Sequence, residues 1–165
     1  MKILQSDQIK EVDLYTMEHE PILSVNLMER AATRCSEWIL REMFYKEAVH
    51  IFIGPGNNGG DGLAVSRHLA EAGMVVYVYL VRITNKLSGD AEVNLSRLKK
   101  CTQVEIENIE DAKALPNIPG GHLIVDALFG SGLNRPLEGL PAAVVKHLNG
   151  QAAIKISIDI PSRSE

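Results

Sequence analysis

Apolar side chains recur along the chain with two different periods, and the period changes near residue 48. Between residues 24 and 43 they return every three or four positions, which is typical of a helix with one buried face. A weaker helical pattern covers residues 6–19, and Pro21 separates the two segments. The same stripe would serve for packing against a core or for a homodimer interface. Its members are Leu27, Met28, Ala31, Ala32, Cys35, Trp38 and Ile39.

From residue 48 onward, short apolar runs alternate with helical patterns. Strands are expected at 49–53, 74–81, 102–106, 122–128 and 153–160, with helices at 63–72, 88–100, 108–115 and 141–149. This alternation implies right-handed crossovers and a mainly parallel sheet that is covered by helices on both faces. The sequence therefore predicts a single α/β domain over residues 1–165, a three-layer Rossmann-like sandwich preceded by two helices.

Residues 54–62 read G-P-G-N-N-G-G-D-G and follow the first expected strand directly. Because such a segment carries little side-chain bulk, its backbone N–H groups can approach a ligand closely. The helix that follows adds the positive end of its dipole, and phosphate is the usual occupant of such a site. A tight turn without a ligand is the alternative, but five glycines with two Asn and one Asp exceed what a turn requires. We expect a nine-residue loop here, with the helix beginning at Leu63.

The glycine pattern alone does not establish a dinucleotide site. Gly54, Gly56 and Gly59 match G-x-G-x-x-G, but the common NAD-binding fold also needs an acidic residue at the end of the next strand. Here the next strand is followed by Arg82, and no carboxylate lies at its end. The chain also lacks the G-K-[ST] ending of a Walker loop. Ordinary hydride transfer and Walker-type nucleotide hydrolysis therefore lose support.

Two aspartates lie near the carboxyl ends of strongly apolar runs, Asp126 and Asp159. In a parallel sheet, residues 54–62, 126–136 and 159–162 would emerge at the same edge, where open α/β sheets bind ligands. If partly desolvated, either carboxylate could act as a general acid or base, anchor a ribose hydroxyl or bind a cation. Oxygens from Asn58, Asp126 and Ser162 would suit a hard cation.

Composition narrows the classes of partner. The chain has 165 residues, a net charge of −4 and a pI near 5.7, which argues against nucleic-acid and membrane-surface binding. No segment approaches the ~20 apolar residues of a membrane span. The first residues lack the apolar centre of a signal peptide, so we expect a cytoplasmic protein. Two cysteines are too few for a metal cluster, and Cys35 is expected as a reduced core thiol.

These motifs together resemble the YjeF N-terminal domain family, the NAD(P)H-hydrate epimerases. The resemblance covers essentially the whole chain, and N-N-G-G-D-G in this setting is far more specific than the bare glycine pattern. It rests on L-M-E-R-A at 27–31, G-P-G-N-N-G-G-D-G at 54–62, S-G-D-A at 88–91, D-A-L-F-G-S-G-L-N-R-P at 126–136 and S-I-D-I-P-S at 157–162, together with Asp13 and Tyr15 in the opening segment.

The resemblance implies an isomerase of metabolite repair, which interconverts the R and S forms of hydrated NADH or NADPH (NADHX, NADPHX) at C6 of the nicotinamide ring. It implies a potassium ion held by Asn58, Asp126 and Ser162, and proton transfer by Asp126 or Asp159. Substrate contacts are implied for Asn57, Asn58, Gly59, Gly60, Asp61, Gly130, Ser131, Gly132, Leu133, Asn134, Arg135, Pro136 and Asp159, those from 130 to 136 at the phosphates.

The chain departs from the family at its end, where it reads P-S-R-S-E with Arg163 in place of Gly. The family continues beyond this point, so we expect a domain that is incomplete at its C-terminus. A C-terminal ADP/ATP-dependent NAD(P)H-hydrate dehydratase domain is the expected continuation in the full-length protein. The alternative function is a non-catalytic module that uses the same pocket to bind a nucleotide-like ligand or to act as a scaffold.

Overall fold

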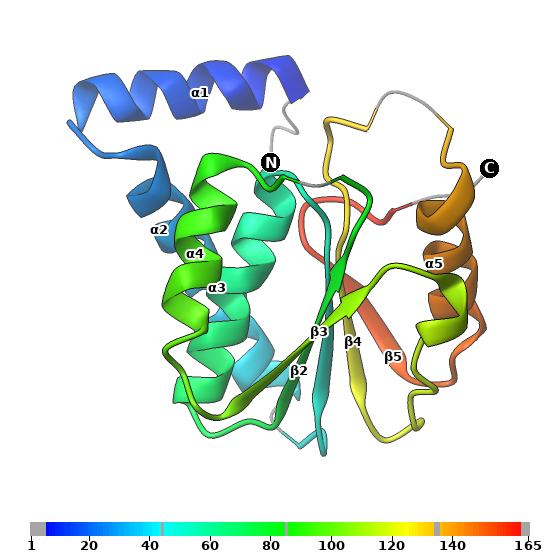
Figure 1. Ribbon diagram of the computed structural model, residues 1–165. Helices are drawn as coiled ribbons and strands as arrows, with labels where there is room; N and C mark the ends of the chain where they lie inside the picture. Colours follow the sequence, from blue (N-terminus) through cyan, green and yellow to red (C-terminus); the bar gives the residue numbers. More distant parts are fainter. Residues whose placement is uncertain (1–5, 44, 85, 134–135, 163–165) are drawn as a thin grey trace.

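The computed structural model describes residues 6–43, 45–84, 86–133 and 136–162. Two helices come first and five strands follow, with helices between most of them (Figure 1). The helices are α1 (Ser6–His19), α2 (Ser24–Met43), α3 (Asn57–Glu71), α4 (Gly89–Leu98) and α5 (Gly139–Gly150), with a 3-10 turn η1 (Ala112–Ala114). The strands are β1 (Val49–Ile53), β2 (Val76–Val81), β3 (Val104–Ile109), β4 (Leu123–Ala127) and β5 (Ile154–Ser157).

The five strands form one sheet in the order β3-β2-β1-β4-β5, and every pair is parallel. The chain moves outward from β1 to β3 and then returns to the other side of β1 to place β4. The strand order therefore reverses between β1 and β4, and a crevice outside the carboxyl ends of these two strands is where such sheets bind ligands. The predicted three-layer α/β architecture is confirmed.

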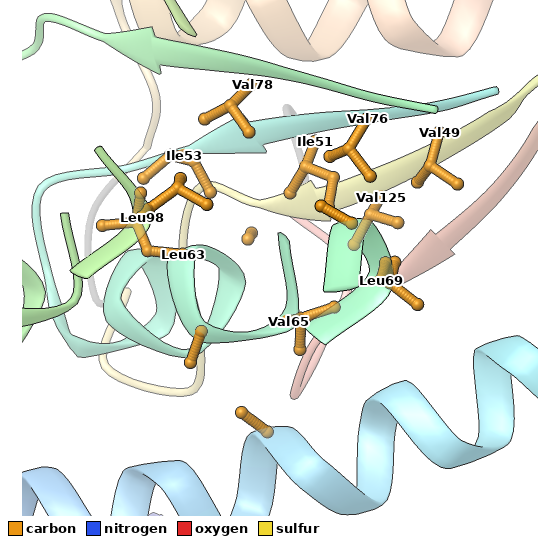
Figure 2. Close-up of a cluster of buried hydrophobic side chains, with 14 of the residues drawn as sticks. Val49, Ile51, Ile53, Leu63, Val65, Leu69, Val76, Val78, Leu98 and Val125 are labelled. Atoms are coloured by element: carbon orange, nitrogen blue, oxygen red, sulfur yellow. The ribbon is translucent and has the colours of Figure 1, made fainter. Parts of the chain in front are cut away.

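Alternate residues of β1 face opposite layers. Val49, Ile51 and Ile53 point to the side covered by α2, α3 and α4, where they pack with side chains such as Leu63 (Figure 2). Phe52 points to the other side and packs with Val144 and its neighbours of α5. Because both faces of the central strands are buried, most residues of these strands are apolar on both sides, without regular alternation.

Helix α2 buries one face through Met28, Ala32, Ser36 and Ile39, which return every three or four residues. Trp38 is 41% exposed, so the predicted stripe is wider than the face that contacts the core. Among the helices that the structure describes, none is long and apolar enough to cross a membrane.

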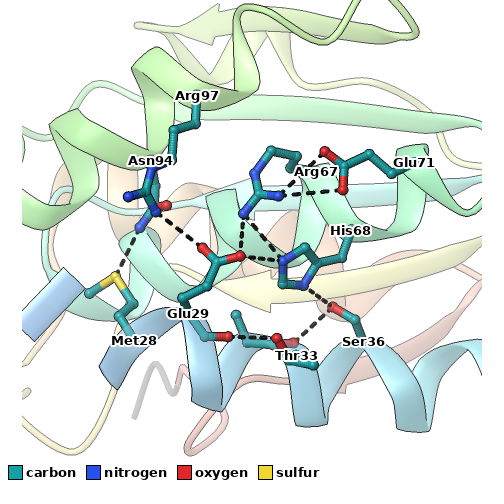
Figure 3. A network of polar contacts seen from close by, with 10 residues as sticks. Met28, Glu29, Thr33, Ser36, Arg67, His68, Glu71, Asn94 and Arg97 are labelled. Carbon is teal, nitrogen blue, oxygen red and sulfur yellow. Dashed lines mark hydrogen bonds and ion pairs between the residues drawn. The ribbon is translucent and has the colours of Figure 1, made fainter. Parts of the chain in front are cut away.

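A polar network ties α2 to α3 and α4 (Figure 3). Glu29 of α2 accepts hydrogen bonds from Arg67 at 2.5 Å and from Arg97 at 3.2 Å, and His68 Nε2 lies 2.6 Å from the same carboxylate. Burial raises the pKa of Glu29, but the hydrogen bonds from Arg67 and His68 outweigh it and lower the pKa overall. The charged carboxylate therefore holds the three helices together behind the sheet.

Three expected boundaries are wrong. Helix α3 begins at Asn57, six residues before the expected Leu63. The helix expected at 108–115 is only the short turn η1, because β3 continues to Ile109 and Asp111 then caps the turn by accepting a hydrogen bond from Lys113 N. The last strand ends at Ser157, so Asp159 lies beyond it, in the left-handed region with a φ of 65°.

Candidate functional site

The connection between β1 and α3 is short, because Asn57 to Gly62 form the first turns of the helix. Gly56 takes the N-cap position in an extended conformation, and no side chain caps the helix. The first N–H groups of α3 are therefore left without a side-chain acceptor at the carboxyl edge of the sheet. Such groups favour an anion, as the sequence predicted, although the nine-residue loop is not formed.

Several glycines in this segment are required by packing. A Cβ on Gly59 would overlap the carbonyl oxygen of Gly54, and a Cβ on Gly54 would overlap that of Leu128. A Cβ on Gly62 would lie 2.5 Å from the Cβ of Ala127. The glycines therefore let α3 pack directly against β1 and β4. By contrast, a Cβ on Gly56 would meet nothing within 4 Å.

Asp126, at the end of β4, joins this strand to the segment after β5. Its carboxylate accepts four hydrogen bonds, from Leu128 N, Ser157 Oγ, Ser162 N and Ser162 Oγ, at 2.8 to 3.4 Å. Ser162 Oγ in turn accepts a bond from Phe129 N at 3.2 Å. The predicted neighbours Asp126 and Ser162 are therefore in direct contact, and both carboxylate oxygens of Asp126 are engaged.

Asn58 connects α3 to the same place. Its Nδ2 donates to the carbonyl oxygen of Phe129 at 2.8 Å, and the residue is only 8% exposed. Its Oδ1 is buried and has no hydrogen-bond partner among the residues that the structure describes. A buried acceptor without a donor is costly, so this oxygen is available for a ligand.

Asp159 faces the segment that follows β4. Its Oδ2 accepts a hydrogen bond from Ser131 N at 2.6 Å. A Cβ on Gly130 would lie 2.5 Å from the same oxygen and 3.5 Å from the Cβ of Asn58. Gly130 therefore lies next to both the Asp159 carboxylate and the side chain of Asn58.

Asp61 lies in the second turn of α3 and is partly buried. Burial raises its pKa to about 7, and the negative charges of Asp159, Asp13 and Asp90 act in the same direction. The helix N-terminus should favour a charged carboxylate, so the upward shift of the pKa reflects how strongly burial and the three aspartates oppose it. The effect of Asp13 places α1 near the site, at the same end of the sheet as the loops after β1, β4 and β5 (Figure 1).

Most of the predicted site residues are brought to this edge. Asn57, Asn58, Gly59, Gly60 and Asp61 lie in the first turns of α3, Asp126 ends β4, and Asp159 and Ser162 follow β5. Gly130, Ser131, Gly132, Leu133 and Pro136 lie in the connection between β4 and α5. The predicted contacts at Asn134 and Arg135 lie outside the described residues. No group of three or more His, Cys, Asp or Glu in the described part of the chain could hold a metal ion.

Asp13 and Asp90 are the residues that pattern reasoning assigned no role. Asp90 lies in the first turn of α4, where it accepts a hydrogen bond from Ser24 Oγ. The N-cap residue of α4, Ser88, donates its N–H to the carbonyl oxygen of Pro55 at 2.8 Å, which brings α4 against the start of α3. Both aspartates lie in segments on which the family resemblance rests, and this was the sequence signal that could have marked them as site residues.

Residues 24–164 match the family described as YjeF-related protein N-terminus. The bifunctional NAD(P)H-hydrate repair enzyme Nnr of Thermofilum pendens is 38% identical over 164 residues, which cover 98% of this chain and 31% of that protein. The NAD(P)H-hydrate epimerase of Rhodopirellula baltica is 35% identical over 155 residues, covering 94% of this chain and 63% of that protein. This chain therefore spans less than two thirds of either relative.

The crystal structure of the yeast protein ynu0 (YNL200c) is similar in fold. It superposes with a TM-score of 0.76 over 98% of this chain and 71% of the yeast chain, at 24% sequence identity. The shared α/β architecture and the match over residues 24–164 agree with the motifs gathered at the carboxyl edge of the sheet. The chain belongs to the YjeF-related protein N-terminus family.

Proposed function

We propose that this chain interconverts the R and S forms of hydrated NADH and NADPH, as an epimerase of nicotinamide-nucleotide repair. The observation that carries the proposal is the meeting of Asn58, Asp126, Asp159 and Ser162 at the reversal of strand order. Several relatives, among them the proteins of Rhodopirellula baltica and Anaerococcus prevotii, are named NAD(P)H-hydrate epimerase. The proposal includes a cytoplasmic protein that acts on a small molecule.

The uncapped start of α3 is the proposed place for one phosphate of the substrate. Its N–H groups and the positive end of the helix favour an anion. Residues 130–136 are proposed to hold the remainder of the pyrophosphate. Asp159, which accepts a hydrogen bond from Ser131 N, is proposed to contact the ribose or the nicotinamide ring.

The oxygen donors at this edge support a potassium ion. Asn58 offers a buried Oδ1 without a partner among the described residues, and Asp126 offers a negative charge within the same group of loops. Oxygen donors of this kind are typical ligands of hard cations. We propose that Asn58, Asp126 and Ser162 hold the ion, which would supply a fixed positive charge beside the phosphate groups. The four hydrogen bonds of Asp126 suit a holding role better than proton transfer.

The proposal is tested by following conversion of (S)-NADPHX into the R form by the native chain and by Asp159→Asn. We expect conversion by the native chain and a loss of at least 100-fold in the variant, as is common for a removed proton-transfer group. Glu37→Gln is the matched control, because it removes one carboxylate from an exposed ion pair on α2. Conversion at the uncatalysed rate by the native chain would contradict the epimerase.

The same experiment separates the epimerase from a non-catalytic binding module. A module would bind NADP⁺ in potassium buffer and change neither epimer.

The outward part of the α2 stripe, which includes the half-exposed Trp38, is the proposed surface for a homodimer. A fused dehydratase domain is proposed because relatives such as that of Thermofilum pendens are bifunctional repair enzymes.

A further inference from the structure

Three carboxylates remain as candidates for proton transfer in the proposed epimerisation, and they differ in how they are held. Asp126 accepts four hydrogen bonds and Asp159 accepts one from Ser131 N. Asp61 has neither a hydrogen bond nor an ion pair with the described residues. A partly buried carboxylate without a partner is unfavourable for folding, which indicates that it is kept for another purpose.

The charged groups that act on the pKa of Asp61 are all negative. They are Asp13 of α1, Asp90 in the first turn of α4 and Asp159 in the segment after β5. On α2, Cys35 is within the electrostatic reach of Asp61, because burial and the charge of Asp61 raise the pKa of its thiol. No cation of the described residues compensates this group. Protonation of Asp61 is thereby favoured, and its pKa of about 7 leaves it part protonated at neutral pH.

The position of Asp61 places it at the proposed site. It lies one helical turn after Asn58, whose Oδ1 is buried and unpaired within the described part of the chain. Asp159 acts on Asp61 electrostatically, and Gly130 lies next to both Asp159 and Asn58. Two carboxylates with different environments at the same edge of the sheet are the usual arrangement of an acid paired with a base.

We infer that Asp61 is the general acid of the epimerisation and that Asp159 is its basic partner, an assignment that rests on the proposed function. Asp61 gives a proton to the C6 hydroxyl, and the C6–O bond breaks with both electrons leaving on the oxygen of water. The lone pair of ring nitrogen N1 forms a double bond to C6, so the ring becomes a cation. Water then adds to the opposite face of C6, and Asp159 takes its proton. Exchange with solvent restores both groups, and reversal exchanges their roles.

The negative surroundings serve this step twice. They keep a proton on Asp61 for the departing hydroxyl, and they stabilise the positive ring that forms when it leaves. Asp13 and Asp90 take part only through their charge, so they are positioning residues in this scheme. No oxidant or further reactant is needed, because water leaves and water returns.

The test is the dependence of kcat/KM on pH for epimerisation of NADPHX in potassium buffer, because this parameter reports the acid of the free enzyme. We expect kcat/KM of the native chain to fall as the pH rises through about 7, since the acid is then lost. Asp61→Asn should lower kcat at least 100-fold, remove this dependence and leave KM nearly unchanged. Asp13→Asn and Asp90→Asn should move the fall in kcat/KM to lower pH, which a purely structural role would not do. Glu37→Gln should leave the profile in place.

A second measurement does not depend on turnover. The side-chain carboxyl carbon of Asp61, observed by NMR, should titrate near pH 7, and a titration near 3.8 would overturn the inference. Epimerisation that survives Asp61→Asn with its pH dependence intact would remove the acid role and leave the proposed function standing. If the native chain converts neither epimer at any pH, the proposed function fails and the acid role fails with it.

Discussion

Replacing Asp61 by Asn is expected to make the protein more stable. Burial and three nearby aspartates raise the pKa of Asp61 from 3.8 to about 7, a shift of about 3 units. At 1.36 kcal/mol per unit, holding this group charged in the folded state costs about 4 kcal/mol. An amide of the same shape avoids that cost. The free energy of unfolding should therefore rise by about 2–4 kcal/mol at pH 8, the lower value allowing for partial solvation.

The gain must depend on pH in a defined direction. Because the folded-state pKa of Asp61 is raised, the folded protein binds the proton more tightly than the unfolded chain. The native chain therefore gains stability as the pH falls through 7 toward 3.8, whereas Asp61→Asn has no such group. The advantage of the variant should shrink to about 2 kcal/mol or less at pH 5.

Urea unfolding at pH 8 and pH 5, followed by circular dichroism, measures both quantities. Asp126→Asn is the matched control, because the same change at this position weakens four hydrogen bonds to a charged group and should cost about 2 kcal/mol or more. If Asp61→Asn proved no more stable than the native chain at pH 8, the electrostatic reasoning on this site would be refuted.

Three further predictions concern the frame around the site. Burial and His122 lower the pKa of His50 to about 4, so the stability that this neutral histidine gives above pH 6.5 is lost as the pH falls. In an Asp61→Asn background, the free energy of unfolding in urea should fall by about 2 kcal/mol from pH 7 to 5. His50→Phe should abolish this fall. Gly59→Ala should cost about 3 kcal/mol or prevent folding, while Gly132→Ala, which meets nothing within 4 Å, should change the thermal midpoint little. Glu29→Gln should cost about 1–3 kcal/mol by calorimetry, against at most about 0.5 for the exposed Glu37→Gln; equal costs would argue against the network.

The sheet and its edge could be predicted from the sequence because long apolar runs and the glycine signature follow local rules. The start of α3 could not, since glycine and asparagine are read as loop formers, and only the close approach of Gly59 to Gly54 and Gly62 to Ala127 explains a helix there. The raised pKa of Asp61 could not be predicted from the sequence either. It depends on Asp13 and Asp90, which come from two other helices and meet it only in the folded chain.

The close approach of the Gly54 and Leu128 backbones, and of Gly59 and Gly54, affects which residues can indicate activity in relatives of this protein. These glycines are needed to build the domain whether or not it turns over any substrate. A descendant that has lost its chemistry would still have to keep them. The carboxylate of Asp61 makes no hydrogen bond or ion pair with the described residues, so its presence, and not the glycine signature, should distinguish relatives that are active enzymes from relatives that have lost the activity.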